Sequence, residues 1–384
     1  MKIYPDFYPE FSCQGEKCLN TCCTNRELIL DSETYEAYQT MPGEIGDIIR
    51  KHLFPKKGTA QIPMNADLRC PFLNEQNLCD IYYNCGTDYL CHTCRKYPQY
   101  VLRKGRHSMA GISLSCEEVL RMIYHRQNPI VMKIEENLGL NSENEQYLYQ
   151  LYRLTNWATE VLQEETLPFP ITLSSIIYLG LSTGNKFLNQ DYDGMNAEFD
   201  TFWEVYQDFT KTMGALSIDQ LDKTAWQFIF QVTNMFCEIV RESDLYQKEL
   251  YLWDDSVFQL GEEERQNYLY HCWRMRTKAP EHLRFVRRLA SLFFSRHMME
   301  LGEKDTHHIL LENMCNYMIV AEVLPATWKP EHRENLSQYF MRLACIGRLF
   351  DDSNIMSTMI APMIENTYHP DVLTYAMAFM ALFQ

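Results

Sequence analysis

The sequence contains no long apolar run and no excess of basic residues. Because no segment of about 18 uncharged apolar residues occurs, no membrane-spanning helix is predicted. The first ten residues include two prolines and two acids, where a secretory signal peptide would need an apolar core. We therefore expect a cytoplasmic protein. Lysine and arginine total 35 against 51 aspartates and glutamates, giving a net charge of −16, which does not favour nucleic-acid binding.

The acidic excess is confined to the later part of the chain. Up to Arg126 there are 15 basic and 15 acidic residues, whereas the remaining 258 residues hold 20 basic and 36 acidic ones. Such an excess could attract a basic partner, but it is more typical of a solvated, soluble surface.

Common catalytic motifs are missing as well. No glycine-rich loop follows a strand and opens a helix, so a dinucleotide site of the Rossmann type is not predicted. The sequence also has no His-Glu-x-x-His motif, no phosphate-binding loop and no nucleophile elbow.

Cysteine is the residue that the sequence has in unusual number and placement. Four of its 14 cysteines stand singly in helical sequence, where we expect them to pack as small apolar residues: Cys237, Cys272, Cys315 and Cys345. The other ten lie among prolines, asparagines and short loops: Cys13, Cys18, Cys22, Cys23, Cys70, Cys79, Cys85, Cys91, Cys94 and Cys116.

The hydrophobic pattern predicts a mainly α protein in two parts. Residues 1–126 form a small, loop-rich, cysteine-rich domain with short strands, and residues 127–384 form an all-helical domain. In the second part apolar residues recur at steps of three and four, for example at 225, 228, 229, 232 and 236.

Local signals predict several elements in the first part. Residues 27–31 are expected to form a short strand, and a helix is expected to begin at 32 with Asp31 or Ser32 as its N-cap. Residues 54–58 are predicted to form a turn, and residues 100–103 and 107–114 a hairpin.

The clustered cysteines favour metal ligation over a disulfide framework. Closely spaced cysteines in a loop let two sulfurs reach one ion, and the reducing cytosol opposes disulfides. Cys22 and Cys23 are adjacent in the chain, a spacing that strains a disulfide between them. Thiolate ligation fits either a four-cysteine zinc site or a [4Fe–4S] cluster.

Several short segments that contain cysteine follow one another along the chain in an order that resembles a known protein family. Phe11-Ser-Cys-Gln-Gly-Glu-Lys-Cys-Leu-Asn-Thr-Cys-Cys23 is followed by Cys70-Pro-Phe-Leu73, Leu78-Cys79, Cys94-x2-Tyr97-Pro98 and Leu114-Ser-Cys116. This order resembles the flagellin lysine N-methylase family, whose cysteine-rich N-terminal region is similar to zinc- or iron-chelating domains. The motif-bearing part covers about the first third of the chain.

The resemblance implies an S-adenosylmethionine-dependent methyltransferase that modifies flagellin lysines and holds an iron–sulfur cluster, with zinc as the alternative. Cys85 and Cys91 do not match the family pattern. The chain also has Asn25-Arg26, Gln99 and Glu117 where family members tend to have Gly-Trp, arginine and proline. The positions that do match, and that the resemblance implies as ligands, are Cys13, Cys18, Cys22, Cys23, Cys70, Cys79, Cys94 and Cys116.

The catalytic residues and the donor site stay open at this point. Methyl transfer to lysine requires a neutral amine and a donor aligned with its nitrogen. Tyr97 is a candidate for the base or orienting group, although a ring packed over the cysteines is the more ordinary role for it. A non-catalytic, zinc- or iron-chelating interaction protein is the alternative function.

Overall fold

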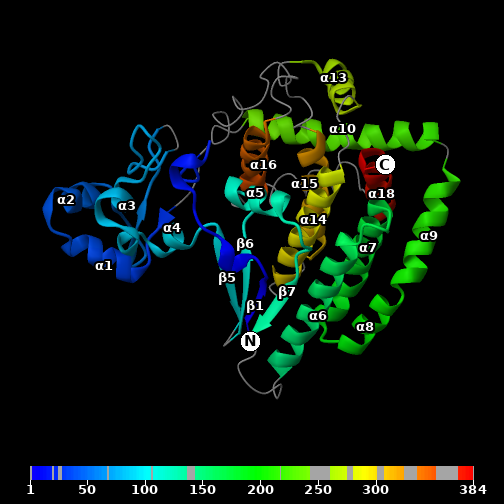
Figure 1. Cartoon of the computed structure of the whole chain (residues 1–384), viewed down its shortest axis with the longest axis horizontal. Coiled ribbons are helices and arrows are strands. Elements are labelled where there is room, and N and C mark those ends of the chain that lie inside the picture. Colours follow the sequence, from blue (N-terminus) through cyan, green and yellow to red (C-terminus); the bar gives the residue numbers. More distant parts are fainter. Residues whose placement is uncertain are drawn as a thin grey trace.

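The computed structural model of the chain is mainly α-helical, with a small strand-containing region near the N-terminus (Figure 1). None of the helices among the described residues is both long and apolar enough to cross a membrane. The structure describes residues 2–19, 21–24, 28–66, 69–104, 107–135, 143–216, 218–242, 260–274, 280–300, 307–323, 335–351 and 371–383.

A small lobe of short elements lies at one end of the molecule's longest axis (Figure 1). Its three-stranded sheet has the order β2-β4-β3, with both pairs antiparallel. The elements of the lobe are β2 Leu28–Ile29, α1 Ser32–Thr40, α2 Gly43–Lys51, β3 Phe54–Lys56, β4 Thr59–Ile62, α3 Asp80–Cys85, η3 Thr87–Tyr89 and α4 His92–Lys96.

A four-stranded sheet lies between the lobe and most of the helices (Figure 1). Its strands are β5 Gln99–Lys104, β6 His107–Ile112, β1 Lys2–Pro5 and β7 Met132–Glu135, in that order. β1 pairs parallel to β6 and antiparallel to β7, so the start of the chain forms one sheet with segments that follow the lobe in the sequence. β7 comes from the part of the chain that the hydrophobic pattern predicts to be helical.

Helices make up the rest of the described chain. α6 packs against α14, α18 packs against α7 and α10, and α5 packs against both α16 and α14. Their bounds are α5 Glu117–His125, α6 Glu143–Gln163, α7 Phe169–Leu188, α8 Tyr192–Asp200, α9 Phe202–Ala215, α10 Ile218–Glu242, α13 Glu262–Arg274, α14 Pro280–Glu300, α15 His307–Val323, α16 Leu336–Asp351 and α18 Val372–Phe383. Two 3-10 turns, η1 Tyr8–Glu10 and η2 Gly15–Lys17, precede the lobe.

Several sequence predictions are confirmed by these elements. β2 lies within 27–31, and Asp31 caps α1 by accepting a hydrogen bond from the Thr34 amide, because an aspartate can satisfy an otherwise unpaired N–H of the first turn. The hairpin of β5 and β6 forms as expected. The cysteines predicted to lie in the helical core, Cys237, Cys272, Cys315 and Cys345, are buried.

The turn predicted over residues 54–58 is wrong in extent. Phe54–Lys56 forms strand β3, and only Lys57 and Gly58 turn the chain, with φ angles of 36° and 84°. A proline such as Pro55 disfavours strand pairing because it has no backbone N–H group to donate. β3 is an edge strand, where a missing backbone donor is tolerated.

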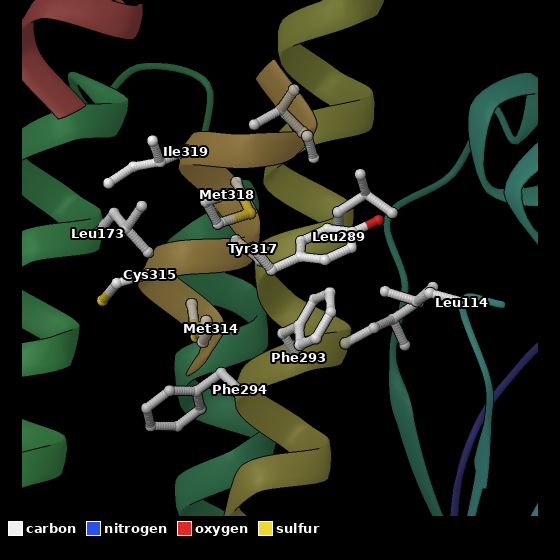
Figure 2. Packing of buried hydrophobic residues seen from close by; sticks show 14 of the residues in the cluster. Leu114, Leu173, Leu289, Phe293, Phe294, Met314, Cys315, Tyr317, Met318 and Ile319 are labelled. Atoms are coloured by element: carbon white, nitrogen blue, oxygen red, sulfur yellow. The ribbon is translucent and has the colours of Figure 1, made fainter. Parts of the chain in front are cut away.

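The described residues form three clusters of buried apolar side chains: a large core, a small core in the lobe, and a minor cluster of Ile171, Met213, Ala376 and Met380. The large core contains residues from the four-stranded sheet and the helices, including Ile3, Met109 and Met132. Figure 2 shows part of it, where Leu114 from the segment after β6 joins Phe293 of α14 and Tyr317 of α15, whose ring centroids are 4.2 Å apart.

The small core lies within the lobe and contains cysteine side chains. Cys70 and Cys91 are buried in it, and the partly buried Cys23, Cys79 and Cys94 pack against it. The division of the chain at residue 126 stays a prediction, but the packing assigns residues 2–11 and 107–135 to the large core. Pairing of β1 with β6 and β7 draws both ends of that early region toward the helices.

Gly347 sets how closely α16 approaches the segment before α5. A Cβ atom at this position would lie 2.6 Å from the carbonyl oxygen of Leu114 and 3.0 Å from the amide nitrogen of Ser115. Because both are backbone atoms, Gly347→Ala is expected to cost about 1–3 kcal/mol of unfolding free energy, measured by urea denaturation. Gly214→Ala in α9 is the matched control, since nothing lies within 4 Å of its added carbon. Equal stabilities of the two variants would contradict the close approach.

Candidate metal centre

The ten N-terminal cysteines all lie in described residues, and none of them is in a disulfide. Nine of them act on one another electrostatically and fall into two sets. We call Cys13, Cys18, Cys22 and Cys116 the junction set, and Cys23, Cys70, Cys79, Cys91 and Cys94 the lobe set.

The junction set lies where the lobe meets the helices. Burial and the neighbouring Glu117, Cys13 and Cys22 raise the pKa of the Cys18 thiol to about 12. Burial raises the pKa of Cys116 as well, and its neighbours Cys22 and Cys18 raise it further. Buried thiols that repel each other's negative charge stay protonated at neutral pH unless a cation compensates them.

The lobe set is part of the small core. Burial raises the pKa of Cys70 to about 11, with the Cys79 and Cys91 thiols adding to the effect. A hydrogen bond from Cys94 lowers the pKa of Cys91 to about 7, and the same pairing raises the pKa of Cys94. One thiolate in this set is therefore already favoured near neutral pH.

Helix N-termini face three of these sulfurs. Cys79, Cys91 and Cys116 are the N-cap residues of α3, α4 and α5. Backbone N–H groups of the first turn lower the thiol pKa at each position, against the effect of burial at Cys79 and Cys116. Partial positive charge at a helix start stabilises a thiolate, so these three positions suit a sulfur that must lose its proton.

Cys22 and Cys23 join the two sets. Their side chains hydrogen-bond to each other, Cys22 acts on the junction thiols and also on Cys70, and Cys23 interacts with Cys70 and Cys79. The amide of Cys70 donates to the carbonyl of Cys23 over 2.9 Å, which holds the paired cysteines against the start of the second cysteine segment. The Cys22–Cys23 dipeptide therefore links the two sets.

Helix α16 fixes the loop that carries this pair. The guanidinium of Arg348, which is 4% exposed, donates to the carbonyl of Thr21 over 3.2 Å and to the Thr24 hydroxyl over 2.9 Å. Gly347 lets the same turn of α16 contact Leu114 and Ser115, next to Cys116. Two cysteine-bearing loops are thus held by one turn of a helix from the far end of the chain.

All eight cysteines that the resemblance implies as ligands fall in the two sets, four in each. Cys91 joins the lobe set although it lies outside the family pattern, and its spacing of Cys91-x2-Cys94 was the signal that could have found it. Cys85 packs against the small core and is not among the thiols that define the sets.

Tyr97 has a structural contact at this place. Its hydroxyl donates to the carbonyl of Ser115 over 2.9 Å and lies 2.7 Å from the Ser115 hydroxyl. The side chain therefore holds the segment that leads to Cys116, and both of its predicted roles, the base or orienting group and the ring packed over the cysteines, stay predictions.

The donor set fits a thiophilic metal or an iron–sulfur cluster. Each set offers at least four sulfurs, the number used by structural zinc and by [4Fe–4S] clusters, and backbone N–H groups at three helix starts complement sulfur charge. Among the described residues, no three His, Cys, Asp or Glu side chains are arranged in the geometry of a metal site. The sulfurs are gathered as neighbours but do not form a closed ligand shell.

Metal binding at these thiols is expected to weaken as the pH falls. Because the pKa values of Cys18, Cys70 and their neighbours are raised, a metal must displace protons from these thiols in order to bind. For each proton displaced, the apparent metal affinity falls about tenfold for every unit by which the pH is lowered. Zinc affinity should therefore rise steeply from pH 6 to pH 8 in competition with a chromophoric chelator. An affinity independent of pH would contradict binding through these thiols.

The fold and the gathered sulfurs define a mainly α protein with a cysteine-rich lobe that carries a candidate metal centre. The chain is similar to two curated proteins named lysine-N-methylase, from Salmonella typhimurium and Salmonella choleraesuis. Each is 30% identical over 139 residues, which is 34% of this chain and 34% of the relative.

The chain is also similar to a protein named flagellar biosynthetic protein FliU, from Salmonella muenchen. That protein is 26% identical over 145 residues, which is 36% of this chain and 85% of the relative. The chain matches about a third of the length of the two lysine-N-methylases. No family model matches the chain. No solved structure matches it either.

Proposed function

We propose that the chain is an S-adenosylmethionine-dependent protein-lysine N-methyltransferase that acts on flagellin in the cytoplasm. The observation that carries the proposal is the likeness, over about a third of the chain, to proteins named lysine-N-methylase. The likeness to a protein named as flagellar supports flagellin as the substrate.

The cysteine lobe supports the second half of the proposal, which is that the enzyme holds a [4Fe–4S] cluster or zinc. Thiols from the segments around residues 13–23, 70–94 and 116 interact electrostatically with one another, and each set contains the four sulfurs that one such centre needs, although no three His, Cys, Asp or Glu side chains of the described residues are arranged as a metal site. An iron–sulfur cluster with an open iron position would supply a binding point for the amino and carboxylate groups of the methyl donor. Because the sequence has no Rossmann-type loop, S-adenosylmethionine would need another way to bind, and such a cluster would supply one.

The chain's own residues have two further tasks in this reaction. They must hold the lysine nitrogen in line with the methyl group of the donor, and they must accept the proton that leaves the ammonium before attack. We propose carboxylates and tyrosines beside the lobe set for the first task.

The test is methyl transfer to flagellin by protein purified without oxygen. We expect label from methyl-labelled S-adenosylmethionine to appear on flagellin lysines, located by mass spectrometry, and iron with sulfide or zinc to co-purify with the chain. Flagellin with acetylated lysines is the control and should take up no label. A metal-loaded protein that leaves flagellin unmodified would contradict the proposal and favour a non-catalytic zinc- or iron-chelating protein.

A further inference from the structure

A hollow of about 310 Å³ opens on the lobe between α1, η3 and α4. This volume is at the lower end of the range for ligand pockets, so it suits a single extended side chain rather than a large cofactor. Its walls carry three carboxylates, two tyrosines and one arginine: Asp31, Glu33, Asp88, Tyr38, Tyr89 and Arg95.

The hollow has a surplus of negative charge. Arg95 is the cation opposite the three carboxylates, and one of its terminal nitrogens donates to the backbone carbonyls of Asp88 and Leu90, both over 2.8 Å. That guanidinium therefore holds the loop before α4. Glu33 and Asp88 are exposed at the rim, where they can meet an incoming cation.

One wall of the hollow is shared with the lobe set of thiols. Tyr38 is 1% exposed, donates its hydroxyl proton to the carbonyl of Tyr89 over 2.6 Å, and interacts electrostatically with Cys91, Cys94 and Cys79. A carboxylate oxygen of Asp31 accepts a hydrogen bond from the amide of His92, the residue after Cys91, over 2.8 Å. The hollow and the lobe set therefore share the residues Tyr38 and Asp31 as neighbours.

Aromatic surface continues beside the hollow. α3 packs against η3 and exposes Tyr82 by 53% and Tyr83 by 75%, and Tyr89 on η3 is 44% exposed. Large exposed tyrosines next to a charged hollow are typical of a surface that binds a polypeptide, because each ring offers contact area at little entropic cost.

We propose that this hollow receives the lysine side chain of a protein substrate, with the exposed carboxylates of Glu33 and Asp88 around the ammonium and the exposed ring of Tyr89 beside the methylene chain. The inference rests on the proposed lysine methylation and adds the site of the acceptor. Carboxylates and tyrosine rings both attract an ammonium group. S-adenosylmethionine fits less well, because its carboxylate would meet three like charges and its purine exceeds the space of a side-chain pocket.

The experiment compares two matched charge-removal variants. Glu33→Gln with Asp88→Asn removes two rim carboxylates of the hollow, whereas Glu36→Gln with Glu44→Gln removes two exposed carboxylates of the same lobe outside it. The probes are a synthetic peptide with one central lysine and the same peptide with that lysine Nε-acetylated. Binding is measured by calorimetry, and KM by label transfer from S-adenosylmethionine.

Native protein is expected to bind the lysine peptide in preference to the acetylated one. The hollow variant should lose that preference, with Kd and KM for the lysine peptide raised roughly tenfold, or about 1.4 kcal/mol, because both rim carboxylates that attract the ammonium are gone. The control variant should stay within about twofold of native protein, and KM for S-adenosylmethionine should be unchanged in both.

Peptide binding and label transfer can fail separately. Equal binding of the two peptides to native protein, or a hollow variant that behaves as the control does, would overturn the lysine site while leaving methylation standing. Preferential binding of the lysine peptide without any label transfer would support an ammonium site at the hollow and contradict the proposed function.

Discussion

Replacing both Cys22 and Cys23 with serine is expected to abolish metal binding by the chain. If the eight cysteines of the family pattern are the ligands, each of these two residues supplies one of the four ligands in its set, so each set keeps only three. A structural metal contributes about 10–16 kcal/mol of binding free energy, which becomes folding free energy when the site is loop-rich. We therefore expect near-complete loss of metal, with unfolding of the lobe at a lower urea concentration.

Metal per chain, measured by atomic emission on protein purified without oxygen, checks this prediction. Cys237→Ser is one control because its side chain is buried among the helices, and Cys85→Ser is another because it packs in the lobe without belonging to either set. Both controls should keep the metal content of native protein. Metal retained by the double variant would exclude the two sets as the binding site.

Single variants resolve how many centres the sulfurs make. Cys116→Ser belongs to the junction set and Cys70→Ser to the lobe set, so with two independent centres each variant keeps about half of the metal. If all the sulfurs serve one centre, either change removes all of it.

Replacing Arg348 with methionine is expected to weaken metal binding from a distance of more than 300 residues along the chain. Its guanidinium is buried and donates to Thr21 and Thr24, which flank Cys22 and Cys23. Methionine keeps the apolar bulk but leaves the Thr21 carbonyl and the Thr24 hydroxyl without these donors. We expect a loss of about 2–4 kcal/mol in unfolding free energy, together with less metal at the junction set.

Arg287→Met separates the two effects. Arg287 is also buried on a long helix, at 3% exposure, and among the described residues it donates to the carbonyls of Leu162 and Leu167, which lie outside the cysteine loops. Its replacement should cost a similar amount of stability and leave the metal content unchanged. The same metal content in both arginine variants would show that α16 stabilises the fold without positioning the sulfurs.

Local features of the molecule could be predicted from the sequence because their causes are local. Asp31 begins α1, since a capping side chain needs only the next three residues, and the hairpin of β5 and β6 requires only neighbouring strands. The apolar residues spaced three and four apart in the sequence do lie in the core, among them Phe228, Ile229 and Val232. The eight candidate metal ligands came from the order of the cysteine-containing segments and from the family resemblance, and their role as ligands stays a prediction.

The grouping of the sulfurs was decided only by the tertiary structure. Spacing along the chain does not say that Cys22 interacts with Cys116, that Cys23 interacts with Cys70, or that Arg348 holds the loop that carries Cys22 and Cys23. Those neighbours are separated by tens to hundreds of residues, and they meet because β1 pairs with β6 and β7 and because α16 packs on α5. Sequence patterns determine what each segment can form, whereas the burial of apolar faces against one another determines which segments share a site.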